Sequence, residues 1–178
     1  MNEYHKEIKE AQQGDKNSFL ALFERYQNDI YRLAYINVKN EEEALDIVQE
    51  TAYRSFKSIK TLKEPKYFKT WLMKIAISCS IDLLRKKNKL VPMEPQIINE
   101  SITSDVTLDT NILLSLTLED LIDELDVSEK NVVLLRFYQD YTFKEISNIL
   151  EIPIGSAKTI LYRALNKMKK SLKEVHSV

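Results

Sequence analysis

A group of polar and basic side chains near the end of the chain has the composition of a DNA-contacting surface. They follow one another at helical spacing within the stretch YTFKEISNILEIPIGSAKTILYRA, residues 141–164. The group comprises Ser156, Lys158, Thr159, Tyr162 and Arg163. Short hydroxyl side chains can hydrogen-bond to base edges, and cations can pair with phosphates. The pattern suits a helix that enters a DNA major groove, although a helical hairpin with a solvated outer face also fits it.

Two short helices joined by a tight turn are expected to position these side chains. Thr142 and Glu145 have the spacing of a capping box, which predicts that the first helix begins there. Pro153 ends the pattern because proline cannot continue a helix interior, and Gly155, one of two glycines in the chain, follows. The second helix is predicted to start at about Ser156. Its inward-facing residues are expected to be Ile160, Leu161 and Ala164.

A second candidate surface lies between residues 61 and 74, where aromatic and basic side chains are interleaved. Unpaired nucleic-acid bases need ring faces for stacking and cations for their phosphates. A core helix with a lysine-coated solvent face explains the same pattern, and the spacing of Trp71 favours a core position. The residues concerned are Lys63, Lys66, Tyr67, Phe68, Lys69 and Lys74.

The charge distribution supports two separate contacts with a polyanion. The chain of 178 residues has a formal net charge of −1. Residues 54–90 carry 11 basic and 2 acidic side chains, and residues 152–178 carry 6 and 1. The intervening residues 91–131 carry 1 basic and 10 acidic side chains. Two basic blocks around an acidic one predict two localised surfaces rather than a general polyanion binder.

The composition argues against several other classes of protein. The single cysteine, Cys79, excludes an internal disulfide and a multi-cysteine zinc site, and its apolar neighbours predict a core position. His5 and His176 lie at opposite ends, and no glycine-rich phosphate loop is present. We therefore expect no enzyme activity, no catalytic residues, no metal and no cofactor. We also expect a cytoplasmic protein, because no signal peptide or run of about 18 apolar residues is visible.

The period of the apolar residues predicts an all-α fold. Helices are expected over residues 4–12, 17–38, 41–59 and 66–87, with Asp15 or Asn17 and then Asn40 as N-caps. The predicted buried stripe of the third helix consists of Leu45, Val48, Ala52, Tyr53 and Phe56. Its other face presents Asp46, Gln49, Glu50 and Arg54.

The helical period fades between residues 91 and 111, where Pro92 and Pro95 stand among polar residues. We therefore expect a flexible linker. At about 3.3 Å per residue, this stretch could span up to roughly 70 Å when extended. It divides the chain into two small helical domains, residues 1–90 and 112–178. In the second domain, helices are predicted over residues 112–125 and from an N-cap at Ser128, followed by the helix-turn-helix.

Three motifs appear in order along this framework. The first is DIVQET at residues 46–51, with Arg54 and Phe56; the second is TWLMKIA at 70–76 followed by IDLLRK at 81–86. The third comprises LLRF at 134–137, FKEI at 143–146, IPIGSAK at 152–158 and LYRA at 161–164. Together they resemble bacterial RNA polymerase sigma factors of the sigma-70 family, in the extracytoplasmic-function (ECF) subgroup, over nearly the whole chain.

Departures from the family pattern affect promoter choice. Ile77 and Ser78 replace the usual Arg-Asn pair, Ser156 and Ala157 replace Thr-Val, and Ile160 replaces a common basic residue. The promoter sequence therefore does not transfer from better-known members.

The resemblance implies three sets of site residues. Those implied to bind core polymerase are Asp46, Gln49, Glu50 and Arg54. Those implied to bind the −10 element are Lys63, Lys66, Tyr67, Lys69, Trp71, Lys74, Asp82 and Arg85. Those implied to bind the −35 element are Ser156, Ala157, Lys158, Thr159, Tyr162 and Arg163, with Lys158 and Arg163 chiefly on phosphates.

The function implied by the resemblance is promoter-specific initiation of transcription, in a stress or envelope response. The expected partners are core RNA polymerase, promoter DNA (duplex at −35, melted at −10) and an anti-sigma factor, which is often membrane-bound in this family. We expect no direct membrane insertion. The alternative is a free-standing helix-turn-helix regulator, although such proteins usually dimerise on symmetric half-sites and no dimer helix is evident. A helical adaptor without a nucleic-acid role is a third possibility.

Overall fold

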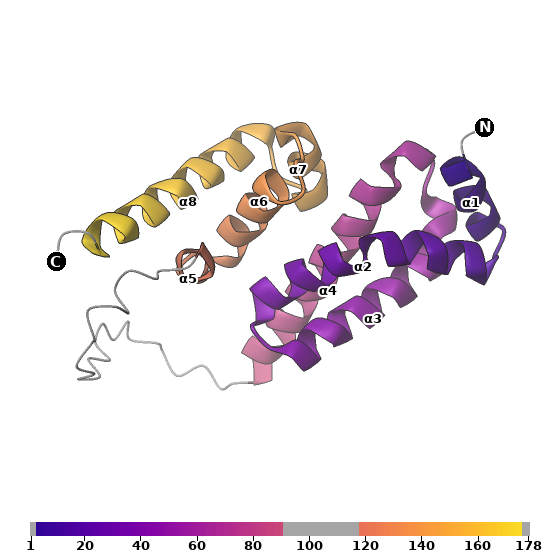
Figure 1. The fold of residues 1–178 in the computed structure, drawn as a ribbon, viewed down its shortest axis with the longest axis horizontal. Coiled ribbons are helices and arrows are strands. Elements are labelled where there is room, and N and C mark those ends of the chain that lie inside the picture. Colours follow the sequence, from indigo (N-terminus) through magenta and orange to yellow (C-terminus); the bar gives the residue numbers. More distant parts are fainter. Residues whose placement is uncertain (1–2, 91–117, 176–178) are drawn as a thin grey trace.

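The computed structural model describes residues 3–90 and 118–175, and every element in these ranges is helical. The first group of helices is α1 (Glu3–Gln12), α2 (Lys16–Val38), α3 (Glu41–Ser58), the short 3-10 turns η1 (Ile59–Thr61) and η2 (Pro65–Tyr67), and α4 (Phe68–Leu90). The second group is α5 (Leu118–Asp123), α6 (Val127–Phe137), α7 (Phe143–Leu150) and α8 (Ile154–Val175) (Figure 1). The predicted all-α fold is confirmed. The predicted linker and residues 112–117 lie outside the described residues.

Local side-chain caps start α2, α3 and α7 where the sequence predicts. The carboxylate of Asp15 accepts a hydrogen bond from the backbone of Ser18, and Asn40 accepts one from Glu43. Thr142 caps α7 in the reciprocal arrangement expected of a capping box.

The predicted cap of α6 is wrong. The N-cap is Asp126, whose carboxylate accepts from the backbone of Glu129 while the Glu129 side chain accepts from the backbone of Asp126. Ser128 lies in the first turn and donates its hydroxyl to Asp126. Both residues are good caps, and the reciprocal bonds of a capping box favour the aspartate.

The buried stripe of α3 is rotated relative to the prediction. Leu45 and Tyr53 are 49% and 62% exposed, whereas Ile47 is buried. The inward face also contains Thr51 and Ser55, and both hydroxyls donate to backbone carbonyls one turn earlier. These bonds satisfy the hydroxyls, so small polar residues can lie in a close helix contact without an unpaired donor. The full set of buried α3 residues is Ala44, Ile47, Val48, Thr51 and Ser55.

The turn before α8 is built around Glu151 rather than glycine. Glu151 has a φ of 56° and ends α7 in the left-handed conformation. The Ser147 hydroxyl donates to the carbonyl of Ile152, and the amide of Ile152 donates to the carbonyl of Ser147. Gly155 is already inside α8, which starts two residues before the predicted position. Leu161 and Ala164 are buried as predicted, and Ile160 is partly buried against the core.

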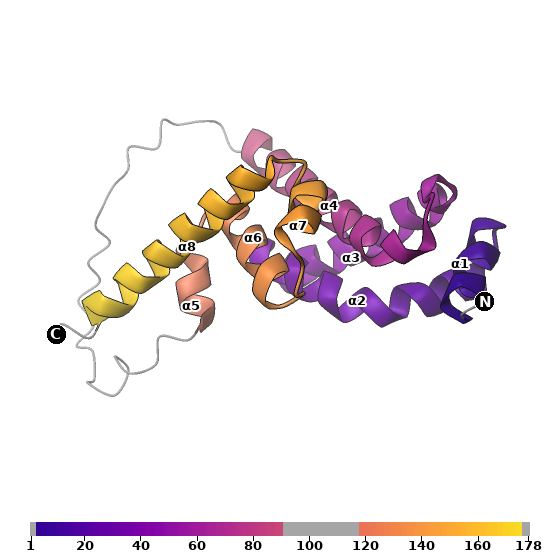
Figure 2. The ribbon, with the colours of Figure 1, turned by 90° about the horizontal axis from the view of Figure 1, so that it is seen from above.

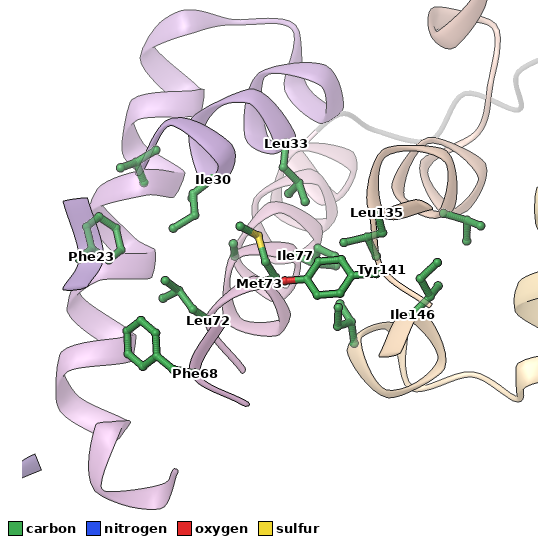
Figure 3. Close-up of a cluster of buried hydrophobic side chains, with 14 of the residues drawn as sticks. Phe23, Ile30, Leu33, Phe68, Leu72, Met73, Ile77, Leu135, Tyr141 and Ile146 are labelled. Carbon is green, nitrogen blue, oxygen red and sulfur yellow. The ribbon is translucent and has the colours of Figure 1, made fainter. Parts of the chain in front are cut away.

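The two groups of helices pack against each other. Helix α7 lies on α4, and α6 lies on α2 (Figure 2). One continuous core runs across both groups, and Tyr141 of the second group points toward Met73 of α4 (Figure 3). No helix in the described ranges has both the length and the apolarity needed to cross a bilayer.

The rotation of α3 leads to a paired stability test. Ile47→Ala should lower the free energy of unfolding by about 2–5 kcal/mol because it leaves a cavity in the core. Leu45→Ala should change it by less than about 0.5 kcal/mol because the side chain is half exposed. Urea denaturation followed by circular dichroism measures both. A larger loss for Leu45→Ala than for Ile47→Ala would contradict the observed rotation.

Candidate nucleic-acid and protein interfaces

The outward face of α3 forms one wall of an open cavity of about 550 Å³. All four residues of the first predicted set contribute to its lining: Asp46, Gln49, Glu50 and Arg54. Tyr53, which the sequence assigned to the core, lies beside them with its ring exposed. Exposed apolar side chains amid carboxylates and amides are a combination suited to a protein partner.

Arg54 connects this wall to α4. Its Nε donates to Glu50 at 2.6 Å, and its Nη1 donates to Asp82 at 2.7 Å. The hydrogen bonds to Asp82 and then Glu50 raise the pKa of the guanidinium above its usual value. Asp82, predicted to contact the −10 element, therefore lies in the cavity beside α3 and pairs with a residue of the other predicted set. Cys79 lines the bottom of the cavity, and burial raises the pKa of its thiol.

The aromatic and basic residues before and within α4 surround a second cavity of about 410 Å³. Four of the predicted −10 residues line it: Lys63, Tyr67, Trp71 and Lys74. Tyr67 is 52% exposed, and Lys66 lies over its ring at 4.9 Å from the centroid. Trp71 is partly buried against the core beside Phe68, so it contributes both to the core and to the cavity wall.

The remaining −10 residues are dispersed along α4. Lys69 lies over the ring of Tyr141, at 5.2 Å from its centroid. Arg85 lines a separate hollow together with Asp82 and Glu151. Lys74 donates to Glu151 at 2.6 Å, and this bond holds the pKa of the Glu151 carboxyl below its usual value. Glu151 and Tyr141 come from the second group of helices, so no local sequence signal points to these contacts.

Helix α8 presents most of the third predicted set on its open face. Lys158, Thr159, Tyr162 and Arg163 are exposed, and Ser156 is partly exposed. Ala157 differs from the prediction because its side chain is fully buried in the core and is directed away from any ligand on this face. The hollow along this face is also lined by residues that the sequence reasoning missed: Asn166, Lys167 and Lys170. Extending the helical period by one and two turns would have found them.

A buried carboxylate holds α8 against α6. Glu129 is fully buried and accepts hydrogen bonds from Arg163 Nε at 2.6 Å and Lys167 Nζ at 2.8 Å. Burial alone would raise the pKa of Glu129, but Lys167, the backbone of Asp126 and Arg163 together hold it below the usual value. Arg163 also approaches Asp126 at 3.4 Å. Much of its hydrogen-bonding capacity is therefore used inside the protein.

The described residues offer no group of His, Cys, Asp and Glu side chains arranged to hold a metal ion. The chemistry of all three surfaces is that of binding: cations, aromatic rings, hydroxyls and carboxylates.

The Glu129 cluster should make the fold sensitive to acid. The pKa of Glu129 is lower in the folded protein than in the unfolded chain. The ionised carboxylate therefore stabilises the fold fully above the unfolded-state pKa of about 4.3, and this stabilisation is lost as the pH falls through the folded-state pKa. Glu129→Gln should lower the free energy of unfolding at pH 7 by about 2 kcal/mol, between the values for exposed and buried ion pairs. It should also flatten the dependence of stability on pH between 7 and 3.

Thermal unfolding across this pH range measures both effects, with Glu24→Gln on the exposed side of α2 as the matched control. Equal pH profiles for wild type and Glu129→Gln would contradict the assignment.

Comparisons with known proteins agree with this arrangement. Residues 22–90 match the family model of Sigma-70 region 2, and residues 121–170 match that of Sigma-70, region 4. The RNA polymerase sigma factor SigV of Bacillus subtilis (strain 168) is 36% identical over 146 residues, which cover 81% of this chain and 84% of SigV. The ECF RNA polymerase sigma factor SigW of the same organism is 29% identical over 181 residues, covering 96% and 97%.

A solved structure shows the same fold. It is that of the sigma factor RpoE in complex with the anti-sigma factor NepR from Bartonella quintana. The two chains superimpose with a TM-score of 0.67 at 17% sequence identity, and the match covers 87% of this chain and 96% of the solved one. The matches to SigV and SigW extend over most of both proteins. The chain therefore belongs to the sigma-70 family of bacterial RNA polymerase sigma factors, in the extracytoplasmic-function subgroup.

Proposed function

We propose that this sigma factor binds core RNA polymerase through α3 and reads promoters through two separate DNA-binding surfaces. The observation that carries the proposal is the presence of three distinct surfaces, on α3, before and within α4, and on α8, inside the two regions that match the family. The domain division proposed with it is residues 1–90 as a region 2-like domain, 91–111 as a linker and 112–178 as a region 4-like domain.

The α3 surface is proposed to bind core polymerase. Asp46 and Gln49 are exposed beside the ring of Tyr53, which gives a polar surface with an apolar centre. Such a mixture gives partner specificity through its charges and affinity through its aromatic ring. Arg54 donates hydrogen bonds to both Glu50 and Asp82. Its proposed role is to fix the position of the Glu50 carboxylate, with Asp82 holding the guanidinium in place.

The 410 Å³ cavity is proposed to hold an unpaired base of the −10 element. Its walls include Tyr67 and Trp71, and its rim carries Lys63 and Lys74. Extruding a base costs a few kcal/mol, and stacking on an aromatic ring returns about 1–3 kcal/mol per base. Together with phosphate contacts from the lysines, this supports capture of a melted strand.

Helix α8 is proposed to enter the major groove at the −35 element. Ser156 and Thr159 are the candidates for base edges, and Lys158 is the candidate for a phosphate. Arg163 is proposed chiefly to orient α8 through Glu129, which modifies the role that the sequence suggested for it.

The proposed mode of action requires no catalytic residue in this chain, because core polymerase supplies the chemistry, and it places the protein in the cytoplasm with that enzyme. An anti-sigma factor is a further proposed partner. The solved RpoE structure contains one, and the exposed apolar residues Leu45 and Tyr53 on α3 are a suitable target for such a protein.

Transcription with purified core polymerase tests the proposal directly. RNA 5′ ends sequenced after overexpression identify a promoter, and run-off transcription on that promoter should require both core polymerase and this chain. Tight binding of the free protein to duplex promoter, with no initiation when core polymerase is added, would instead support a free-standing helix-turn-helix regulator.

Substitutions in α8 separate DNA contact from helix positioning. Lys158→Ala should weaken promoter binding by the holoenzyme several-fold and reduce the slope of log K against log salt by about 1, the loss of one phosphate contact. Arg163→Ala should lower the melting temperature of the protein and leave the salt slope nearly unchanged, because its partner is Glu129. Filter binding at several salt concentrations measures the slopes. A larger slope change for Arg163→Ala would reverse the two assignments.

A further inference from the structure

The last residue of α1 is hydrogen-bonded to the segment between α3 and α4. The side-chain amide nitrogen of Gln12 donates to the carbonyl of Leu62 at 2.7 Å and to the carbonyl of Ile59 at 3.2 Å. An amide nitrogen carries two N–H groups, so one is available for each carbonyl. The two partners lie 50 and 47 residues away in the sequence, and α1 lies beside the turn between α3 and α4 (Figure 1). Gln12 therefore ties the first helix to a distant part of the chain.

The segment that Gln12 holds is one wall of the 410 Å³ cavity. Residues 61–64 all line that cavity, together with Trp71. Residues 62–64 belong to no helix. Backbone outside a helix lacks the regular series of hydrogen bonds that fixes a helical turn, so other contacts have to hold it. The position of this wall therefore depends on side chains that reach it from elsewhere.

Two kinds of contact hold the wall in place. The side chains of Ile59 and Leu62 are 1% and 6% exposed and lie in the core, which anchors the segment at two points. Gln12 adds hydrogen bonds to the carbonyls of the same two residues. Apolar burial has no preferred direction, whereas a hydrogen bond weakens steeply when its angle changes. The core therefore fixes the depth of the segment, and Gln12 fixes its orientation.

Helix α1 is itself held firmly enough to act as a support. Ile8 and Ala11 are buried in the core. The ring of Tyr4 packs edge-on against Phe68, the first residue of α4, with 6.3 Å between the centroids. The hydroxyls of Tyr4 and Tyr26 are hydrogen-bonded at 3.2 Å. These contacts join α1 to both α2 and α4, so Gln12 extends from a fixed base.

We propose that Gln12 is a positioning residue for base recognition at the −10 element. It holds the wall of residues 61–64 at the distance from Tyr67 and Trp71 at which an unpaired base fits. A binding site has to be held to within about 0.5 Å of its productive geometry, so a displaced wall loses its fit to one base. Attraction of the lysines for phosphates carries no sequence information, so the effect falls on base discrimination. The proposal rests on the proposed function, because it assigns the cavity to −10 DNA.

The single tryptophan of the chain tests this geometry without DNA or polymerase. Trp71 lines the cavity, so acrylamide quenching of its fluorescence measures how well the wall covers it. Gln12→Met keeps the length of the side chain and removes both donors. It should raise the quenching constant of the folded protein at least about 1.5-fold, because a segment with fewer hydrogen bonds opens more often. The matched control is Gln13→Met at the exposed next residue, which should leave the constant unchanged.

Transcription by the holoenzyme tests the consequence for base choice. Discrimination is the ratio of initiation rates on the mapped promoter and on a template with one substituted base. Gln12→Met should lower this ratio about three- to tenfold at the most selective position of the −10 element, in line with the loss of one hydrogen bond. The ratios for substitutions in the −35 element should keep their wild-type values, because α8 is the proposed reader there. Gln13→Met should match wild type at both elements.

A second variant keeps the test decisive if Gln12→Met does not fold, which circular dichroism establishes. Gln12→Glu has the same length, and its ionised carboxylate accepts hydrogen bonds but donates none. It should raise quenching and lower −10 discrimination in the same direction. Wild-type quenching in a folded variant, unchanged −10 discrimination, or an equal loss of discrimination at both elements would overturn the positioning role.

Failure of the proposed function gives a different result. Wild type that initiates with core polymerase but shows no base preference in the −10 element would contradict the assignment of the cavity to −10 DNA. The quenching experiment does not depend on that assignment, and it reports separately whether Gln12 holds the wall.

Discussion

The arrangement of the molecule depends on α4, a helix with apolar residues on more than one side. Leu72 and Ala76 lie in the core of the first group, and Cys79 packs with residues of α2 and α3. Met73 and Ile77 are covered by the second group. A helix that is apolar on several sides has to be covered on all of them, so α4 acts as the centre around which both groups assemble. Among its lysines, Lys74 is exposed and lines the aromatic cavity.

Three of the charged side chains proposed to bind partners are also part of the internal structure. Arg54, Lys74 and Arg163 each pair with a carboxylate from a different element. These side chains are 37%, 45% and 52% exposed, so each retains a solvent-facing part that a ligand can approach. Pairing restricts their rotamers before a partner arrives, and it also means that a phosphate has to compete with a carboxylate already in place.

The sequence by itself determined the features that depend on neighbours a few residues away. Helix positions, the caps at Asp15, Asn40 and Thr142, and the open face of α8 all follow from local hydrogen bonding and periodicity. Only the tertiary structure decided which face of α3 is buried, because Leu45 and Ile47 are both apolar and the choice depends on what packs there. Likewise, Arg163 meets Glu129 across 34 residues and Lys74 meets Glu151 across 77. Such pairings arise when separate elements pack together, and no local pattern encodes them.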